Sequence, residues 1–349
     1  MELERVNRLP MLTWRYLKTN DSPLPFRRAD RPAKVSWSDR TYLTEGAELP
    51  DRFEGASPAW RAEAAAGECY TVRIPEGAEA ELRADVTLSE AAPDYAGTYV
   101  IHLEKGAKLN LVWKWTGGGE EGVCAAAMVY HLEAGASLHV SAAEEGLANK
   151  LFCVQRLVEA ADGAEAEFVS ADIGGRTVII NSRGYLDGVK SVIREYGLYA
   201  AGGDQNLDLF YHIDHIGEES ESDIEVKGAL IERAKKSFRS TIDFKRGCAG
   251  SVGSEGDYAI QLDPETKNIS LPLLLCTEDN VQGNHASSAG QIDPETVYYL
   301  MTRGMTREEA RRVVVESLVR PLIDRLDESL REDVLVNIHQ KLGAVRAGQ

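Results

Sequence analysis

Gly106-Ala107-Lys108-Leu109-Asn110-Leu111 joins a Gly-Ala turn to a run of alternating polar and apolar residues, and this unit recurs along the chain. Equivalent Gly-Ala pairs begin at Gly77, Gly135 and Gly163, so that successive glycines are 29, 29 and 28 residues apart. Alternation with a period of two is typical of a strand with one buried face. A constant interval of this length indicates stacked repeats, in which each unit buries its apolar face against its neighbours. The repeat therefore predicts a mainly β protein built on a parallel β-helix.

Two other architectures fit this spacing less well. A β-sandwich has turns every 8–12 residues or so, whereas each interval here has room for about three short strands. A hexapeptide β-helix needs a six-residue period, which the chain lacks. Gly188, Gly217 and Gly247 extend the rhythm at intervals of 25, 29 and 30 residues, without the Gly-Ala pair. We therefore expect further coils up to about residue 290.

Composition argues against several classes of partner and site. The 349 residues carry a formal net charge of −17, which does not suit nucleic acid or an anionic membrane as the main partner. The five cysteines include no Cys-x-x-Cys pair, so neither a disulfide framework nor a zinc ribbon is expected. The first residues lack the apolar core of a signal peptide, and no apolar run approaches the ~18 residues of a membrane helix. We expect a cytoplasmic protein.

Residues 1–70 form a proline-rich segment that differs from the repeats. Half of the chain's twelve prolines lie there, which predicts an extended path with short helices only at 11–17 and 59–66. Because an uncapped stack exposes strand edges, we expect this segment to lie along the stack and to cover its open end. The expected domains are a capping segment at 1–70, a β-helix core at 71–291 and a helical domain at 292–349.

Helical signals begin at about residue 292. Asp293 is a suitable N-cap, and Gly304 suits the position after a helix C-terminus. Thr306 opens a capping box with Glu309, and Pro321 should kink or break the second helix. The expected buried face of that helix consists of Ala310, Val313, Val314 and Leu318, and a further helix contains Leu322, Leu326, Leu330 and Val334.

The segment from Tyr211 to His215 has the composition of a metal site. On a strand, however, His212 and Asp214 face one side while His215 faces the other. The three side chains cannot converge without a bulge, so polar ladders along the stack are favoured over metal binding. The chain contains no Walker motif and no Gly-x-Gly-x-x-Gly loop.

Possible iron ligands concentrate at 271–291, where strands give way to helices. Cys276 ends an apolar run that we expect to be a buried strand; Glu278 and Asp279 follow, and then His285. Histidine, thiolate and carboxylate are ligand types that iron accepts. The residue types alone favour the alternative, in which His285 stabilises the junction between the two domains.

Several short motifs occur together between about 205 and 330. They are His215, Ser220, Ser222, Lys227-Gly228, Pro272, Glu278-Asp279, His285-Ala286, Gly290-Gln291-Ile292-Asp293, Tyr299-Leu300-Met301-Thr302-Arg303-Gly304 and Glu308-Glu309-Ala310-Arg311. In this combination the chain resembles the SufB/SufD family of the SUF iron–sulfur cluster assembly system. The resemblance is compositional in the earlier coils and weak in the first 70 residues.

The resemblance implies a fold, partners and a function. Family members have a right-handed parallel β-helix core and a C-terminal helical domain. They pair as SufB–SufD heterodimers or as homodimers, and each helical domain docks an ABC-type ATPase subunit, SufC. The complex assembles iron–sulfur clusters and passes them to apo-proteins. The resemblance therefore implies a non-enzymatic scaffold that works with a SufC-like ATPase and with a SufB-like paralogue or a second copy of itself.

Two departures separate this chain from SufB. SufB-like chains carry a cysteine on the strand that here reads Gly256-Asp257-Tyr258, and a glutamate where this chain has Ala286. A histidine followed by a small residue, as in His285-Ala286, is similar to SufD. We therefore expect a SufD-like subunit that does not hold a cluster tightly by itself.

The resemblance also implies the site. His285 would lie at the dimer interface and supply one ligand to a transient iron–sulfur cluster, with the other ligands coming largely from the partner chain. Cys248 and Cys276 are weaker candidates; free cysteines are often simply buried, and we expect that of Cys276. The ATPase contact would use exposed charges at Arg307, Glu308, Arg311 and Arg312.

Two other functions remain open from the sequence. A carbohydrate-active β-helix enzyme would need a groove with paired carboxylates or a general base on neighbouring coils, and no arrangement of the acidic residues singles out such a pair. A purely structural subunit is the second alternative. We expect no catalytic residue.

Overall fold

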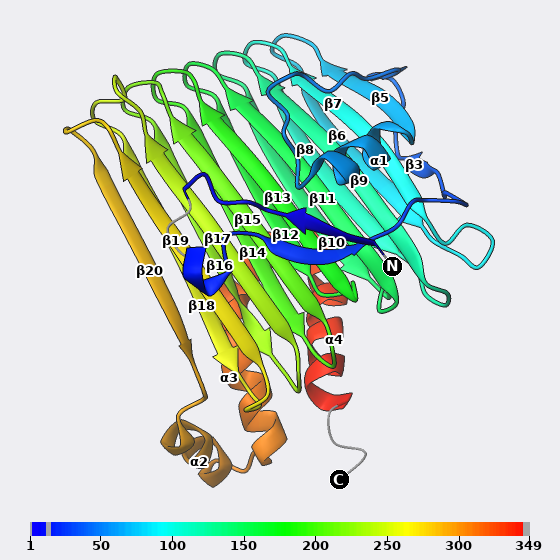
Figure 1. Cartoon of the computed structure of the whole chain (residues 1–349), viewed down its shortest axis with the longest axis vertical. Helices are drawn as coiled ribbons and strands as arrows, with labels where there is room; N and C mark the ends of the chain where they lie inside the picture. Colours follow the sequence, from blue (N-terminus) through cyan, green and yellow to red (C-terminus); the bar gives the residue numbers. More distant parts are fainter. Residues whose placement is uncertain (1, 12–14, 345–349) are drawn as a thin grey trace.

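Two nine-stranded sheets packed face to face form the body of the molecule (Figure 1). This computed structural model describes residues 2–11 and 15–344. From β5 onward, consecutive strands alternate between the two sheets, and from β7 onward each strand pairs in parallel with the strand two places before it. The chain therefore winds as a parallel β-solenoid of about eight turns, which confirms the predicted fold class. Each turn contains two long strands rather than three short ones.

One sheet, called the even sheet here, contains mostly even-numbered strands. In spatial order they are β20 (Gln282–Gly290), β18 (Val252–Gln261), β16 (Glu221–Leu230), β14 (Val192–Ala201), β12 (Glu165–Asp172), β10 (Ser137–Glu145), β8 (Lys108–Thr116), β6 (Glu79–Thr87) and β3 (Val35–Trp37).

The other sheet, called the odd sheet, follows the same order of coils. Its strands are β19 (Lys267–Cys276), β17 (Lys235–Phe244), β15 (Asn206–His215), β13 (Thr177–Leu186), β11 (Lys150–Ala160), β9 (Gly122–Leu132), β7 (Tyr95–Leu103), β5 (Glu68–Ile74) and β4 (Leu43–Glu45).

The alternating apolar positions fill the space between the sheets. In the even sheet, Leu138 of β10 lies in register with Leu109 of β8 and with Ala166 of β12, and all three are buried in the main core. The register repeats from coil to coil, so similar side chains stack in columns. Each coil thus buries its apolar surface against the next, at about 25 cal/mol for each Å² removed from water.

The turns between coils share one left-handed backbone position. The four glycines of the Gly-Ala pairs adopt φ values between 62° and 69° there. In the next three coils this position holds Lys190, Glu219 and Gly250, each of which donates its backbone N–H to the following turn, as the earlier glycines do. Gly188, Gly217 and Gly247, which extend the rhythm in the sequence, lie in the same turns, two or three residues before this position. At the first two of these, a side chain would collide with the backbone of the preceding coil, which explains the glycine.

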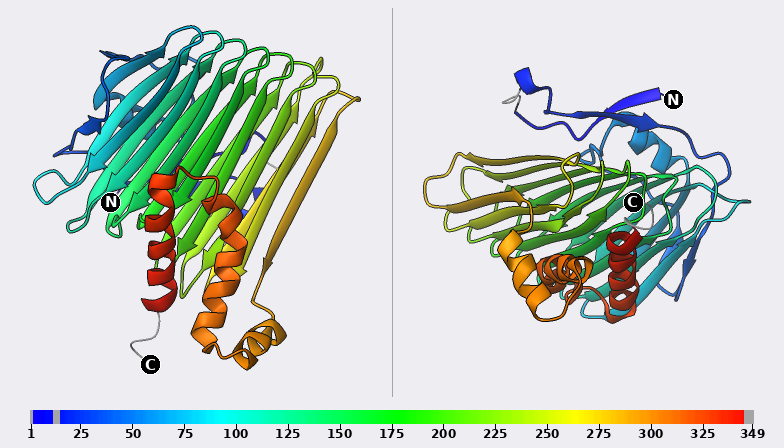
Figure 2. Two further views of the ribbon diagram at one scale, coloured as in Figure 1. Left: turned by 180° about the vertical axis from the view of Figure 1, so that it is seen from behind. Right: turned by 90° about the horizontal axis from the view of Figure 1, so that it is seen from below.

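The N-terminal segment lies across the outer face of the odd sheet and over the first coil (Figure 2). β1 (Glu2–Val6) and β2 (Ser22–Phe26) form an antiparallel hairpin, and α1 (Pro58–Ala65) packs nearby through Trp60. The strands β3 and β4 pair antiparallel with β6 and β5 at the first coil. The segment therefore lies along the stack, as expected, and the end that it covers is the first coil.

The two short helices expected in this segment have different outcomes. The one at 59–66 corresponds to α1. The one at 11–17 falls partly outside the described residues, and its described part contains the 3-10 turn η1 (Arg15–Leu17).

Helices from the C-terminal region cover the outer face of the even sheet (Figure 2). α3 (Arg307–Ile323) and α4 (Glu328–Ala344) bury apolar side chains against β8 to β14, while α2 (Pro294–Thr302) packs on α3. Asp293 caps α2, and Thr306 forms the predicted capping box with Glu309 at the start of α3. None of the helices within the described ranges has the length and apolar content needed to cross a bilayer.

Two details of α3 differ from the prediction. Pro321 lies inside α3 rather than at its end. The helix continues for two more residues to Ile323, although proline removes one backbone hydrogen bond. Val313 is exposed, because the side of α3 that meets the sheet is set by tertiary packing. The buried residues of α3 are Ala310, Val315, Val319, Leu322 and Ile323.

Candidate functional site

The last coil, made of β19 and β20, leaves the stack open at one end. No strand within the described residues pairs with the outer edge of either strand. All nine residues of β20 are exposed, and Figure 1 shows this strand at the margin of the even sheet, opposite the end that the N-terminal segment covers. Both the backbone edge and the inward-facing side chains of this coil are therefore accessible.

His285 occupies an inward-facing position of this open coil. It is in register with Glu255 of β18, which is itself in register with the core residue Ile224 of β16. Because β20 is the last strand of its sheet, the imidazole of His285 is 53% exposed. Its Nδ1 lies 3.9 Å from Oε1 of Glu255, which is beyond hydrogen-bond distance. A histidine ligand is therefore presented at the end of the stack.

Glu255 lies directly behind His285 with a fully buried side chain. Burial raises the pKa of Glu255 to about 8, and the Ser240 hydroxyl and the Leu273 backbone lower it to a smaller extent. At neutral pH this carboxyl group is mostly protonated. Glu255 was not identified from the sequence, where its signal is an acidic residue at an inward position of an alternating strand.

Cys276 is exposed, so its expected burial was wrong. It ends β19, in register with the core residue Phe244, and faces the interior at the open coil, where no further coil covers it among the described residues. Its Sγ lies 2.9 Å from the carbonyl oxygen of Glu278. Cys248 is instead buried, and desolvation raises the pKa of its thiol. Of the two cysteines, only Cys276 is accessible to a cluster.

The structure does not bring His285, Cys276 and Cys248 together as a three-ligand set. Within the described residues, only one group of three metal-type ligands has its atoms close together, and it lies elsewhere. His215 takes no part in the open coil either: its two ring nitrogens lie 2.8 Å and 2.7 Å from the hydroxyls of Ser220 and Ser222. Burial lowers the pKa of His215 to about 4. It is a neutral core histidine whose hydrogen bonds connect β15 to the following turn and to β16.

Comparison with known proteins decides the family. The family model for the SUF system FeS cluster assembly SufBD core domain matches residues 87–318. The chain belongs to the SufBD core family. The matched range runs from the end of β6 to α3, so the open coil and His285 lie within the family's domain.

Individual relatives carry names from the same system. The iron–sulfur cluster assembly protein SufD of Bacillus subtilis is 29% identical over 141 residues, which are 40% of this chain and 32% of the relative. SufD of Escherichia coli is 24% identical over 205 residues, 58% of this chain and 48% of the relative. SufB of B. subtilis is 22% identical over 165 residues, 47% and 36% of the two chains. The matches thus span about a third to a half of these relatives.

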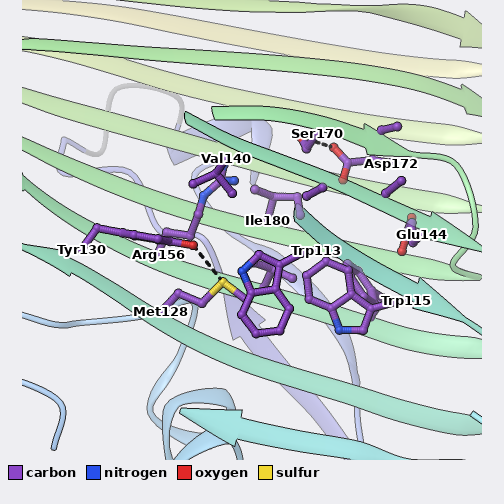
Figure 3. Close-up of a pocket in the computed structure, with 15 residues that line it drawn as sticks. Trp113, Trp115, Met128, Tyr130, Val140, Glu144, Arg156, Ser170, Asp172 and Ile180 are labelled. Atoms are coloured by element: carbon purple, nitrogen blue, oxygen red, sulfur yellow. Dashed lines mark hydrogen bonds between the residues drawn. The ribbon is translucent and has the colours of Figure 1, made fainter. Parts of the chain in front are cut away.

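The SufBD core also contains a small cavity between the sheets (Figure 3). Trp113, Trp115 and Arg156 line it together with Glu144 and Asp172, two carboxyl groups on neighbouring coils. Burial raises the pKa of Glu144 to about 8 and that of Asp172 to about 6. The cavity measures about 20 Å³, enough for about one water molecule. This carboxyl pair was not identified from the sequence, and the space beside it does not admit a sugar ring.

The expected ATPase-binding face on α3 is only partly exposed. Arg307 and Glu308 are exposed, but Arg311 and Arg312 are half-buried. Arg311 donates from Nη2 to the carbonyl oxygen of Leu262, 2.5 Å away, and so anchors α3 to the loop after β18. The expectation that all four side chains are exposed was therefore wrong for Arg311 and Arg312. A cleft of about 370 Å³ lies beside it, lined by residues that include Val297, Tyr298, Met301, Arg307 and Arg311.

Proposed function

We propose that this SufBD-core protein is a SufD-like scaffold subunit in iron–sulfur cluster assembly, and that it is not an enzyme. Family membership and the names of its relatives support a role in assembly. The higher identity to SufD than to SufB of B. subtilis supports the SufD type, as does Ala286 in place of a glutamate. The proposed partners are a SufC-like ABC ATPase and a SufB-like paralogue or a second copy of the chain.

The observation that carries this proposal is the placement of His285. A solvent-accessible imidazole at an inward position of the open coil can ligate iron from a substrate cluster. Cys276 lies on the other strand of the same coil but forms no three-ligand set with it. One chain therefore supplies part of a ligand set, and a partner docked at the open end supplies the rest. Transient holding of a cluster between two subunits follows from this division.

The first prediction is that His285→Ala lowers the iron and acid-labile sulfide recovered with the assembled complex. Even the loss of an outer-shell partner weakens metal retention by about tenfold or more, so the loss of a ligand should cost at least that. The measurement is iron and sulfide per complex after co-expression with the paralogue and the ATPase. Ser287→Ala, two residues along the same face of β20, is the matched control and should retain wild-type content.

Thermal melting separates a ligand from a structural role. Because His285 is half exposed and makes no hydrogen bond to Glu255 at 3.9 Å, the alanine variant should melt like the wild-type chain. A variant that unfolds, while the folded fraction keeps its full iron content, would show that His285 is structural.

The proposed contact for the ATPase is the exposed end of α2 and α3. Tyr298 and Tyr299 are 70% and 55% exposed on α2, and Arg307 is exposed at the start of α3. Exposed aromatic and arginine side chains are enriched where proteins bind partners. This surface is therefore better suited to docking than Arg311, whose side chain already binds the loop after β18.

The second prediction is that Arg307→Glu combined with Tyr298→Ala weakens co-purification of the ATPase. Neither side chain is buried, so the melting temperature should change little, in keeping with the usual effect of about ±0.5 kcal/mol at exposed sites. Arg311→Ala is the contrasting variant: it removes the bond to Leu262 and should lower stability. Unchanged ATPase capture by the double variant would move the contact away from this face.

A further inference from the structure

Another group of metal-type ligands lies on the outer face of the odd sheet, on the two coils before the open coil. His212 and Asp214 are two residues apart on β15 and so share a face, and Asp243 of β17 is in register with Asp214. One ligand atom from each side chain lies within 4.8 Å of the others. All three residues are more than nine-tenths buried. The third ligand is thus Asp243 of the next coil, not His215, which faces the core.

His212 is the member of this group that points to a ligand. It is 4% exposed, and neither ring nitrogen has a hydrogen-bond partner among the described residues. Its Nε2 lies 3.4 Å from Oδ1 of Asp214, longer than a good hydrogen bond. A buried imidazole without a good hydrogen bond costs free energy. A bound cation would use the lone pair that the protein leaves unpaired.

The two aspartates need a counter-charge because carboxylates in register on adjacent strands repel each other. The ammonium of Lys245 supplies it: Nζ lies 2.9 Å from Oδ1 of Asp214 and pairs with Oδ2 of Asp243. Lys245 is 44% exposed and lies just after β17, so its flexible side chain can turn outward without disturbing the strand. The ammonium does not contact the imidazole of His212, whose Nε2 lies 3.4 Å from Oδ1 of Asp214.

We propose that His212, Asp214 and Asp243 bind a divalent first-row cation of the Mn²⁺ or Fe²⁺ class, in exchange with the ammonium of Lys245. One imidazole and two carboxylates suit such ions, and three protein ligands leave positions for water. The cation neutralises both carboxylates, gives the imidazole a partner and ties β15 to β17. The site is separate from His285, so it does not depend on the proposed scaffold function.

Manganese titration of the full chain tests the site. Mn²⁺ is the probe because a hard ion avoids the thiol of Cys276. The chain is first treated with a chelator, and the electron paramagnetic resonance signal of free Mn²⁺ then shows how much of the added metal is bound. We expect one site for each chain. His212→Gln and Asp243→Asn should each weaken binding by about tenfold or more.

Lys245→Met distinguishes a metal site from a purely structural ion network. It removes the competing charge but keeps the apolar stem, so it should tighten Mn²⁺ binding. Lys235→Met, at the other end of the same face of β17, is the matched control and should bind like the wild type. Mn²⁺ should also raise the melting temperature of the wild type but not that of His212→Gln.

Three results would overturn the proposal. They are the lack of a one-to-one site, equal binding by the wild type and the His212→Gln chain, and weaker binding after Lys245→Met. If Asp243→Asn fails to fold, His212→Gln decides, because it leaves both carboxylates and Lys245 in place. Acid-labile sulfide recovered with the assembled complex should not change in His212→Gln, whereas it should fall in His285→Ala.

Discussion

Glu255 gives the open coil a chemical character that His285 alone would not have. With its pKa raised to about 8 by burial, the carboxyl group is a neutral acid at pH 7. A neutral acid does not attract a cation as a carboxylate does. In its protonated form Glu255 therefore does not offer a bound cluster the negative charge of a carboxylate.

The raised pKa of Glu255 also predicts how the stability of the fold depends on pH. A carboxyl group whose pKa is higher in the folded state binds its proton more tightly there. Its contribution to the free energy of unfolding is complete below the unfolded pKa near 4.5. That contribution is lost as the pH rises toward 8. Glu255→Gln should remove this loss and should stabilise the chain at pH 8 relative to the wild type by roughly 3–5 kcal/mol.

Denaturant unfolding of both chains between pH 4.5 and 8.5 measures this effect. The pKa of Glu144 is raised in the same direction, so the variant keeps some slope of its own, and the difference between the two curves isolates Glu255. Parallel curves would mean that the carboxyl group of Glu255 is ionised inside the fold.

Single residues of the site differed in how well the sequence revealed them. His285 could be selected from its neighbours in the chain, because the motif around it is local. Glu255 could not, since its burial depends on the register of β18 with β16. Burial of Cys276 was predicted wrongly because the apolar run at 271–276 is typical of a covered strand, whereas β19 is the last strand of its sheet.

Among the elements, the turns show where the repeat is under strain. Lys190 and Glu219 adopt φ values of 57° and 54° at a position that holds glycine in the first four coils. The left-handed conformation costs an L-residue with a side chain roughly 1–2 kcal/mol. The ion pair between them, 3.3 Å long and exposed, offsets little of that cost.

Glu219→Gly should therefore stabilise the chain by about 0.5–1 kcal/mol, because relief of the strain exceeds the added flexibility of the unfolded chain. Gly135→Ala is the matched control with the opposite sign. At Gly135 φ is 69° and no atom lies near an added Cβ, so only backbone strain acts. Thermal melts of the two variants should shift in opposite directions; a lower melting temperature for Glu219→Gly would contradict the argument.

The elements could be predicted from the sequence to the extent that their signals are local. The caps of α2 and α3 depend on Asp293, Thr306 and Glu309, which act within four residues, and they were correct. The buried face of α3 was not, because it is selected by strands far away in the chain. The Gly-Ala pair is lost in the later coils although their turns remain, because Lys190 and Glu219 adopt the left-handed turn position without glycine.

The whole molecule is asymmetric along its stack. The first coil is covered by β3 and β4, and the outer faces carry the N-terminal hairpin and the helices α3 and α4 (Figure 2). At the other end β20 has a full row of exposed residues and an unpaired edge among the described strands. Proteins normally block such edges, and a free edge is suited to strand pairing with a partner. The proposed pairing with a paralogue or a second copy would use this edge.

The backbone pattern of β20 supplies a test of that pairing. Gln282 donates its N–H to Ser251 of the preceding turn. In a parallel ladder alternate residues point the same way, so Ser287 directs its N–H to the open edge and Ser288 directs its own toward β18. Ser287→Pro should abolish association, measured by light scattering, with little change in melting temperature, because proline is tolerated where the missing donor faces outward. Ser288→Pro should instead lower the melting temperature, because it removes a bond inside the sheet. If Ser287→Pro associates as the wild type does, the partner docks somewhere other than the free edge of β20.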